Sequence, residues 1–248
     1  MVVSIQSIVQ FLILAGESES EDEVKHHLET LLLAYGFRFY GLRLHQRPHH
    51  ESVESAVMSR WPEGWSELYA ARKYVLIDPT IRTLSTAQRP FRWMDAVIGL
   101  RSDPQRARMD RMMQEAGRVG LHDGYVFPVH GRNGLLGSMT IGGDALDLSP
   151  AEVALFQSAA RLGFWRVMEI RGEADALEQS AQVDTQLTRR EMEVIKLLAD
   201  GLTSHEIAKE LTISNHTVDW YINGLQEKLK ARNRQHVVAL AFRLGLVA

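Results

Sequence analysis

The chain has 248 residues, of which 45% are hydrophobic and 24% are charged, a composition ordinary for a globular protein with a substantial core. This length fits two domains of unequal size. The absence of Cys excludes disulfides, thiolate metal sites and thiol nucleophiles, and suits a reducing cytoplasm. The formal net charge of −3 excludes a uniformly basic surface, so nucleic-acid binding would depend on local placement of Lys and Arg.

The N-terminal part predicts two helices and a strand. Residues 8–15 are apolar but too few to cross a bilayer, so we expect a buried helix and no membrane partner. A second helix begins in the acidic stretch 17–23, where Ser20 and Glu23 have capping-box spacing. Residues 37–44 read as a strand. The three histidines that follow around Pro48 indicate a solvated loop rather than a metal site, because no Asp or Glu pattern supports zinc: His45, His49 and His50.

Several helix starts follow in the middle of the chain. Pro62 predicts a helix that carries Trp65 and Tyr69 on one face. Asp78-Pro79 and Asp103-Pro104 each combine a capping Asp with Pro at the first helical position. Taken singly, these aromatic residues are typical of a core, and none of them by itself indicates a ligand.

A hairpin and a long helix come next. The strand 125–130 is followed by Asn133-Gly134, a strong signal for a tight turn. The return strand places Leu136, Ser138 and Thr140 on one face, which is small and partly polar. That face suits the wall of an enclosed cavity better than a packed core. Ser149 to Glu152 then form a capping box that starts a helix running to about Met168.

Apolar residues become sparse between 171 and 186, which indicates the domain boundary. We therefore predict a first domain at 1–172, a linker at 173–186 and a second domain at 187–248. Residues 184–248 carry one net positive charge and the remainder of the chain carries four net negative charges.

The second domain predicts four short capped helices. Capping boxes stand at 188–191 and 203–206, Ser214 caps a third helix, and Asn233 a fourth. Two short helices joined by a tight turn, the second longer and polar at its start, have the geometry of a helix-turn-helix. On periodicity alone, however, any small helical bundle would show the same pattern.

The literal residues are more specific. The stretches LTRREMEV, ADGLTSHEIAKELTIS, TVDWYI and EKLKARNRQHVVALA closely resemble the DNA-binding domain of LuxR-type regulators over its whole length. Tyr221 departs from the family, which often has His there. The resemblance implies a homodimer on an inverted-repeat promoter site, with two recognition helices in successive major grooves. We expect base contacts from Asn215, His216 and Asp219, and phosphate contacts from Thr203, Lys209, Ser214, Thr217, Lys228 and Lys230.

The first domain resembles the acyl-homoserine-lactone-binding domain of the same receptors. Trp65, Tyr69, Asp78-Pro79 and Trp93 have its spacings, and GLHDGYVFPVHGRNGLLGSMTI resembles its later part. The implied fold class is α+β, with an α-β-α sandwich around a central antiparallel sheet followed by an all-α helix-turn-helix domain. The implied ligand site consists of Trp61, Trp65, Tyr69, Asp78, Thr80, Trp93, Val126 and Thr140.

The resemblance also implies a role for each group. Trp65 would donate its indole N–H to the lactone carbonyl, and Asp78 would accept the amide N–H. Trp93 would pack on the lactone ring and Tyr69 would line the acyl side. Thr80 and Thr140 would place hydroxyls near the amide or acyl carbonyl. Where many of these receptors have Tyr, this chain has Trp61, which can donate but not accept a hydrogen bond, so we predict a short, branched or aryl acyl group.

Three other functions are weighed against this one. A phosphorylated response regulator would need an acidic pocket at a strand end, whereas Glu21-Asp22-Glu23 precedes a helix. A lactone hydrolase would need a G-x-S-x-G motif, a metal-spaced His/Asp cluster or a Cys, and the sequence contains none of these. A purely structural module would leave the capped C-terminal helices without a purpose. The sequence thus predicts a cytoplasmic, non-enzymatic quorum-sensing regulator with a signal ligand but no cofactor or metal.

Overall fold

The computed structural model describes residues 5–45, 55–131, 134–179, 187–244 and 246–247. The chain divides into two compact units. The first holds residues 1–174 apart from 131–134, and the second holds the remainder. Helix α8, Ala174–Gln179, lies within the predicted linker. The domain limits drawn from the sequence stay a prediction.

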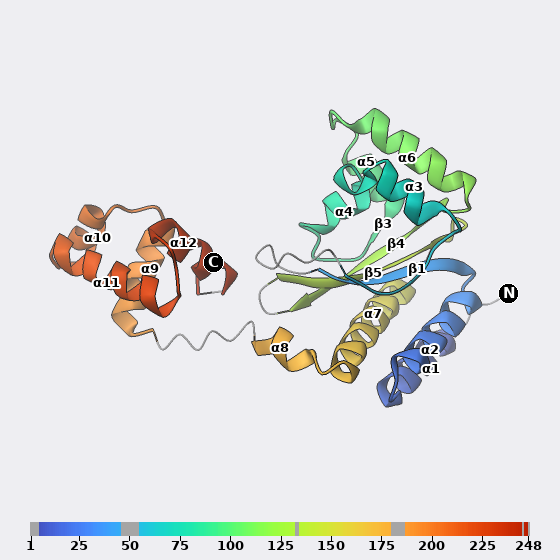
Figure 1. Ribbon diagram of the computed structural model, residues 1–248, viewed down its shortest axis with the longest axis horizontal. Helices are drawn as coiled ribbons and strands as arrows, with labels where there is room; N and C mark the ends of the chain where they lie inside the picture. Colours follow the sequence, from blue (N-terminus) through green and yellow to red (C-terminus); the bar gives the residue numbers. More distant parts are fainter. Residues whose placement is uncertain (1–4, 46–54, 132–133, 180–186, 245, 248) are drawn as a thin grey trace. The chain divides into compact units, whose positions relative to one another are not determined.

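A five-stranded antiparallel sheet forms the middle layer of the first unit, with the strand order β2-β1-β5-β4-β3 (Figure 1). The strands are β1 Phe37–Leu44, β2 Ser55–Arg60, β3 Phe91–Arg92, β4 Asp123–Gly131 and β5 Gly134–Gly143. The predicted strand at 37–44 and the predicted hairpin strands are therefore confirmed. Gly134 has φ 112°, a backbone region open mainly to glycine, while Asn133 of the predicted turn lies outside the described residues.

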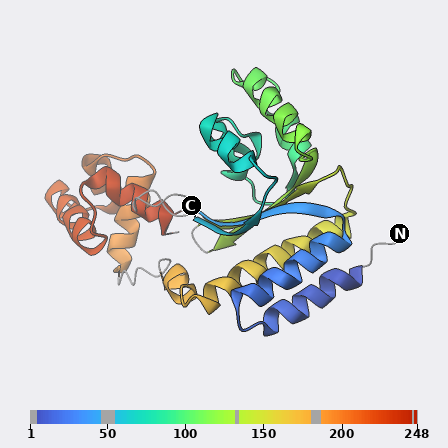
Figure 2. The ribbon, with the colours of Figure 1, turned by 45° about the vertical axis from the view of Figure 1, so that its right-hand side comes forward.

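Three helices cover one face of this sheet (Figure 2). They are α1 Ile5–Glu17, α2 Glu21–Ala34 and α7 Pro150–Ile170. Phe156 of α7 contacts Phe37 and Phe127 of the sheet, with ring centroids 6.2 and 5.8 Å apart. The Ser149–Glu152 capping box is formed, and α2 buries an apolar face made of Val24, Leu28, Leu31 and Leu32. The Ser20 cap is also formed, but the Glu23 carboxylate accepts the N–H of Glu19 rather than that of Ser20.

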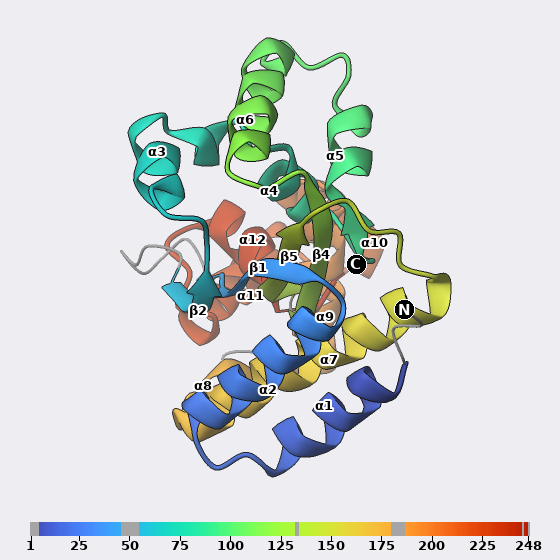
Figure 3. The ribbon, with the colours of Figure 1, turned by 90° about the vertical axis from the view of Figure 1, so that its right-hand side faces the viewer.

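The short helices between β2 and β4 cover the opposite face (Figure 3). They are α3 Trp65–Ala71, the 3-10 helix η1 Tyr74–Leu76, α4 Pro79–Leu84, α5 Trp93–Gly99 and α6 Arg106–Arg118. Two begin later than predicted. Gly64 has φ 74°, which cannot belong to a right-handed helix, so α3 starts after it rather than at Pro62. The Asp103 carboxylate accepts the N–H of Gln105 in a turn that precedes α6. The α-β-α sandwich is confirmed.

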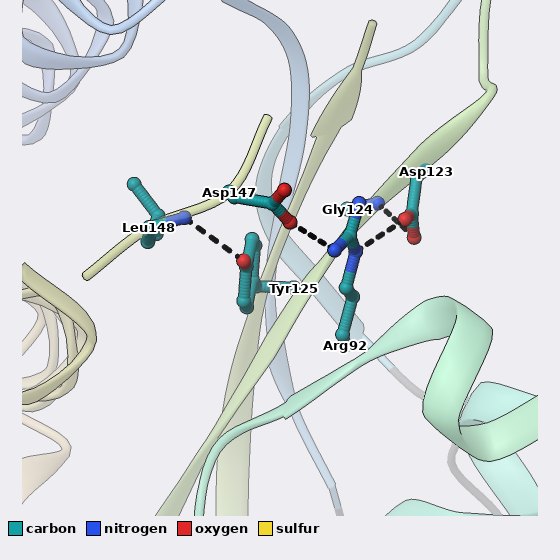
Figure 4. A network of polar contacts seen from close by, with 6 residues as sticks. All are labelled: Arg92, Asp123, Gly124, Tyr125, Asp147 and Leu148. Atoms are coloured by element: carbon teal, nitrogen blue, oxygen red, sulfur yellow. Dashed lines mark hydrogen bonds and ion pairs between the residues drawn. The ribbon is translucent and has the colours of Figure 1, made fainter. Parts of the chain in front are cut away.

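An ion-pair network ties β3 to β4 and to the segment before α7 (Figure 4). The Arg92 guanidinium lies between the carboxylates of Asp123 and Asp147 and donates to both. Asp123 is 3% exposed, and its second oxygen accepts the N–H of Gly124 at 2.8 Å. Beside it, the hydroxyl of Tyr125 accepts the N–H of Leu148 at 3.0 Å. The network fixes the backbone immediately before Trp93.

The second unit contains α9 Arg189–Ala199, α10 Ser204–Leu211, α11 Asn215–Lys228 and α12 Arg234–Arg243. The two predicted capping boxes and the caps at Ser214 and Asn233 are formed. Apolar side chains from all four helices form one core: Val194, Ile195, Leu198, Ile207, Ala208, Val218, Ile222, Leu225, Leu229, Val237 and Ala241. The all-α second unit agrees with the predicted fold class.

We expect Arg92→Ala to destabilise the first unit by about 3–5 kcal/mol, because it leaves the buried Asp123 carboxylate without its cation. Arg38→Ala is the matched control, since the pair Arg38–Asp144 is largely exposed and its loss should cost about 1 kcal/mol or less. Urea unfolding followed by tryptophan fluorescence measures both changes. Equal effects of the two substitutions would show that the Arg92 network does not secure this edge of the sheet.

Candidate functional site

A cavity of about 200 Å³ lies between the sheet and the helices that follow β2. Helices α3, α4, α5 and α6 and strands β1, β4 and β5 all contribute side chains to its wall. Every side chain predicted for a ligand site lines this one cavity: Trp61, Trp65, Tyr69, Asp78, Thr80, Trp93, Val126 and Thr140. The structure therefore brings the predicted set together, while the role of each member stays a prediction.

The Asp78 side chain accepts three hydrogen bonds in the cavity wall. Asp78 is 9% exposed and is the N-cap of α4. One carboxylate oxygen, Oδ1, accepts the backbone N–H and the hydroxyl of Thr80 at 2.8 and 2.6 Å. The other, Oδ2, accepts the hydroxyl of Tyr69 at 2.8 Å. A carboxylate has about four acceptor positions, so these three donors from the described residues leave one position on Oδ2 for a further N–H or O–H.

The same bonds fix the direction of two hydroxyls. Thr80 and Tyr69 each have one hydroxyl proton, and both donate it to Asp78. The Thr80 oxygen can therefore still accept a hydrogen bond from a ligand. A contact with a ligand carbonyl, as predicted for Thr80, would require its proton to turn away from Asp78.

The indole of Trp93 packs directly against the backbone of two glycines, Gly124 and Gly142. A Cβ atom at Gly124 would lie 2.7 Å from Cε2 of the indole, and a Cβ at Gly142 would lie 2.3 Å from Cη2. Both distances are far below van der Waals contact, so the indole occupies space that only glycine leaves open. Its buried Nε1 has no hydrogen-bond partner among the described residues. Trp93 therefore presents a rigid, flat wall to the cavity.

Two further aromatic groups shape the wall. Trp65 is 8% exposed and stacks on Tyr74, with ring centroids 6.3 Å apart. Trp61 lies across Gly41 of β1, where an added Cβ would come within 2.8 Å of its ring. Both indoles thus reach the cavity from the chain that leaves β2, and Gly41 provides the space for one of them.

Ser138 of β5 lines the cavity with Thr140, as expected from the small, partly polar face of that strand. Sequence reasoning missed Arg43 and placed His45 in a solvated loop, whereas both line the cavity at the end of β1. Their positions follow from the two-residue period of β1, in which Gly41 already faces the cavity. The missed apolar residues Ile81, Leu84, Met112, Met113, Ala116 and Leu121 complete the wall with Ser66. Leu121 lies between α6 and β4, and the others come from helices whose inner faces look like ordinary core in the sequence.

The second unit presents the predicted helix-turn-helix. Helices α10 and α11 are joined through Thr212, whose φ of 55° closes α10. Asn215 and His216 are exposed in the first turn of α11. Asp219 is also exposed, but it accepts a hydrogen bond from the Ser204 hydroxyl at 2.8 Å and so links the two helices. A base contact by Asp219 would have to coexist with this hydrogen bond or replace it.

The predicted phosphate-binding residues fall into two groups. Lys209 and Lys230 are exposed, and their placement is compatible with a phosphate contact. Thr203 and Ser214 act as helix caps, and the Ser214 hydroxyl is 2.8 Å from that of Thr217. The ammonium of Lys228 binds Glu191 at 2.7 Å. None of these bonds excludes a phosphate contact, and the assignments stay predictions.

Glu191 connects α9 with α11 from a nearly buried position, 6% exposed. Its carboxylate oxygen Oε2 accepts the N–H and hydroxyl of Thr188 as well as the Lys228 ammonium. Burial alone would raise the pKa of Glu191, but the bonds from Lys228 and Thr188 outweigh it and hold the pKa below its usual 4.5. One carboxylate thus caps α9 and fixes the recognition helix against it.

Trp220 was not singled out from the sequence, where an aromatic residue at helical spacing suggests core. The structure leaves it 64% exposed on α11, one residue after Asp219. Its only signal in the sequence is position: it falls between the buried Val218 and Ile222, on the opposite side of the helix.

Two negative findings concern the residues that the structure describes. No helix among them is long and apolar enough to cross a membrane. Nor do they contain a group of three or more His, Asp or Glu side chains placed to hold a metal ion. His49 and His50, considered above for a metal site, lie outside the described residues.

The chain matches two protein-family models. Residues 20–167 match the model described as an autoinducer binding domain. Residues 185–241 match the model described as bacterial regulatory proteins, luxR family. The two matches fall on the two units of the structure.

Similar curated proteins cover nearly the whole chain. The transcriptional activator protein BjaR1 of Bradyrhizobium diazoefficiens is 31% identical over 89% of this chain and 87% of its own length. The quorum sensing-dependent transcriptional regulator RpaR of Rhodopseudomonas palustris is 30% identical over 88% and 86%. Among solved structures, that of SdiA from Escherichia coli covers 97% of this chain and 98% of its own, at 23% identity and a TM-score of 0.57. That last similarity supports the fold.

We expect Glu191→Gln to destabilise the second unit by about 1.5–3 kcal/mol at neutral pH, since it removes the charge that Lys228 and Thr188 bind. The folded-state pKa of Glu191 is lowered, so its stabilisation is present above pH 4.5 and is lost as the pH falls below that value. The difference between the variant and the parent should therefore shrink toward pH 3.

Hydrogen exchange of α9 and α11 in the full chain measures this difference at each pH. Glu193→Gln is the control, because Glu193 pairs on the same helix with the largely exposed Arg189 and Arg190. A difference between Glu191→Gln and the parent that stays constant between pH 7 and pH 3 would contradict the assignment.

Proposed function

The chain belongs to the LuxR family of quorum-sensing transcriptional regulators, and from this premise we propose that its signal is an N-acyl-homoserine lactone. The proposed acyl group is short, branched or aryl. The proposed DNA target is an inverted-repeat promoter site, bound by a homodimer in the cytoplasm. The regulator has an autoinducer-binding domain joined to a DNA-binding helix-turn-helix.

The observation that carries the choice of ligand is the one acceptor position left on Oδ2 of Asp78. An N-acyl-homoserine lactone has a single amide N–H, which matches that position in number and in kind. A bond between this N–H and a carboxylate is charge-assisted and therefore stronger than one between neutral groups. Trp65 would then donate its indole N–H to the lactone carbonyl, and Trp93 would pack against the lactone ring.

The size of the cavity supports a small acyl group. Its volume of about 200 Å³ lies below the roughly 300–1,000 Å³ common for small-molecule pockets. Trp61 adds bulk where a smaller side chain would lengthen the cavity along β1, since its ring lies on Gly41. Val126 is buried at the facing strand and keeps that side apolar.

Two features support a dimer on DNA. The second unit carries little net charge, so one copy offers limited phosphate attraction, and two linked copies would multiply their binding. The outer side of α1 also exposes Ile5, Val9 and Ile13, each one turn from the next. An apolar stripe of this kind suits contact with a second copy of the chain better than contact with water.

We expect Asp78→Asn to weaken lactone binding about 10- to 150-fold, the equivalent of losing about 1.5–3 kcal/mol from a charged hydrogen bond. Asp95→Asn is the control, because Asp95 is exposed on α5 and does not line the cavity. Calorimetry with a series of acyl groups measures both effects. Unchanged affinity of Asp78→Asn would contradict the proposed ligand geometry, and tightest binding of long linear acyl groups would contradict the proposed acyl class.

For DNA we expect two different losses. Asn215→Ala should reduce discrimination between the selected site and mismatched sites by about 1–3 kcal/mol, because a base contact is removed.

Lys209→Ala should weaken binding to all sequences alike and lower the salt dependence by about one phosphate. Fluorescence anisotropy of the ligand-loaded chain on an inverted repeat selected from random DNA, and on its single half-site, tests both losses and the dimer. Equal affinity for the half-site and the full repeat would contradict a dimer.

A further inference from the structure

The cavity has a second group of polar side chains, which comes from the sheet rather than from the helices. Nε2 of His45 lies 2.8 Å from the hydroxyl oxygen of Ser138. Arg43 is the direct cross-strand partner of Ser138 in the antiparallel register of β1 and β5. Ser138 is 1% exposed, and the backbone N–H of His45 donates to the backbone carbonyl of Leu136 at 2.8 Å. The three residues therefore place polar side chains in one part of the cavity wall, at the end of β1 and on β5.

The position of this cluster along the sheet can be read from β5. Gly142 lies under Trp93, and Thr140 and Ser138 follow on the same face at two-residue spacing. At about 3.4 Å per residue, Ser138 lies about 7 Å beyond Thr140 and about 14 Å beyond Gly142. With the lactone ring at Trp93, as in the proposed function on which this step rests, the cluster faces the far end of the acyl group.

The chemistry of the cluster does not suit a hydrocarbon end. A methyl group can neither donate to nor accept from a guanidinium, an imidazole or a hydroxyl, so placing it against them gains no polar contact. An oxygen atom at the same place could accept from the guanidinium, whose N–H groups form a broad fork, and could exchange a hydrogen bond with His45 or Ser138. We propose that the acyl group of the signal carries an oxygen-bearing group, a hydroxyl or a carboxylate, at its far end, bound by Arg43, His45 and Ser138.

Two sets of matched lactones test this inference on the full chain by calorimetry. The first set is hexanoyl-, 6-hydroxyhexanoyl- and 5-carboxypentanoyl-homoserine lactone, which differ only in the terminal group. The second set is 3-phenylpropanoyl-homoserine lactone with and without a hydroxyl at the far position of the ring. In at least one set, an oxygen-bearing lactone should bind about tenfold or more tightly than its apolar parent, because it gains hydrogen bonds to a charged donor.

Substitutions then assign that preference to the cluster. Arg43→Met and Ser138→Ala should each lower the ratio of the two affinities to about threefold or less, whereas Arg38→Met should leave it unchanged. Arg38 is the matched control, since it lies on the same strand but its side chain is 53% exposed and outside the cavity wall. Thermal unfolding without ligand checks that each variant is folded.

The outcomes separate the two proposals. Equal or tighter binding of the apolar parent in both sets would overturn this inference and leave the proposed function standing. Failure of all five lactones to bind would overturn the proposed function itself. A preference that survives both Arg43→Met and Ser138→Ala would overturn the assignment to this cluster. The comparison of lactones on the unmodified chain decides the inference even if a variant does not fold.

Discussion

The Asp78 carboxylate joins the fold of the first unit to its binding site. It caps α4 through the N–H of Thr80 and receives the hydroxyl of Tyr69 from α3, so the short helices on this face of the sheet are positioned around one buried anion. A buried carboxylate is costly unless its acceptor positions are filled. Donors from the described residues fill three, and the fourth remains on a carboxylate that lines the cavity. The constraint that holds α3 and α4 together therefore also favours a ligand with one donor.

The rest of the cavity wall is likewise held in place by contacts that stabilise the fold. The Arg92–Asp123 network fixes the edge of the sheet, and the glycines at 124 and 142 leave room for the indole of Trp93. A ligand that completes such a wall binds only the folded chain and stabilises it by mass action. In the second unit, the Glu191 carboxylate has a comparable position, since it caps α9 and binds Lys228 of α11. Each unit is thus organised around one carboxylate that bonds to more than one helix.

Much of this arrangement could be predicted from the sequence where the signal is local. The capping boxes at 149–152, 188–191 and 203–206 are formed as expected, because Ser or Thr and Glu three residues apart interact within one turn. The predicted cavity residues came from resemblance, and the structure places them together. Long-range features were not predictable. The pairing of Arg43 with Ser138, the packing of Trp93 against two glycines and the exposure of Trp220 depend on which strands and helices become neighbours. The sequence predicts that α3 starts at Pro62, because Pro is common in the first turn of a helix. The helix starts at Trp65 instead, because Gly64 has a positive φ that its sequence context does not indicate.

A crystal structure of the chain with a bound N-acyl-homoserine lactone would show directly what binds to Asp78. We expect the amide nitrogen of the ligand at about 2.7–3.2 Å from Oδ2 of Asp78, with the bonds from Tyr69 and Thr80 retained. The lactone ring should lie against Trp93, and the acyl group should extend along β5 toward Ser138. A ligand outside this cavity, or one whose amide N–H points away from Asp78, would contradict the role proposed for this carboxylate.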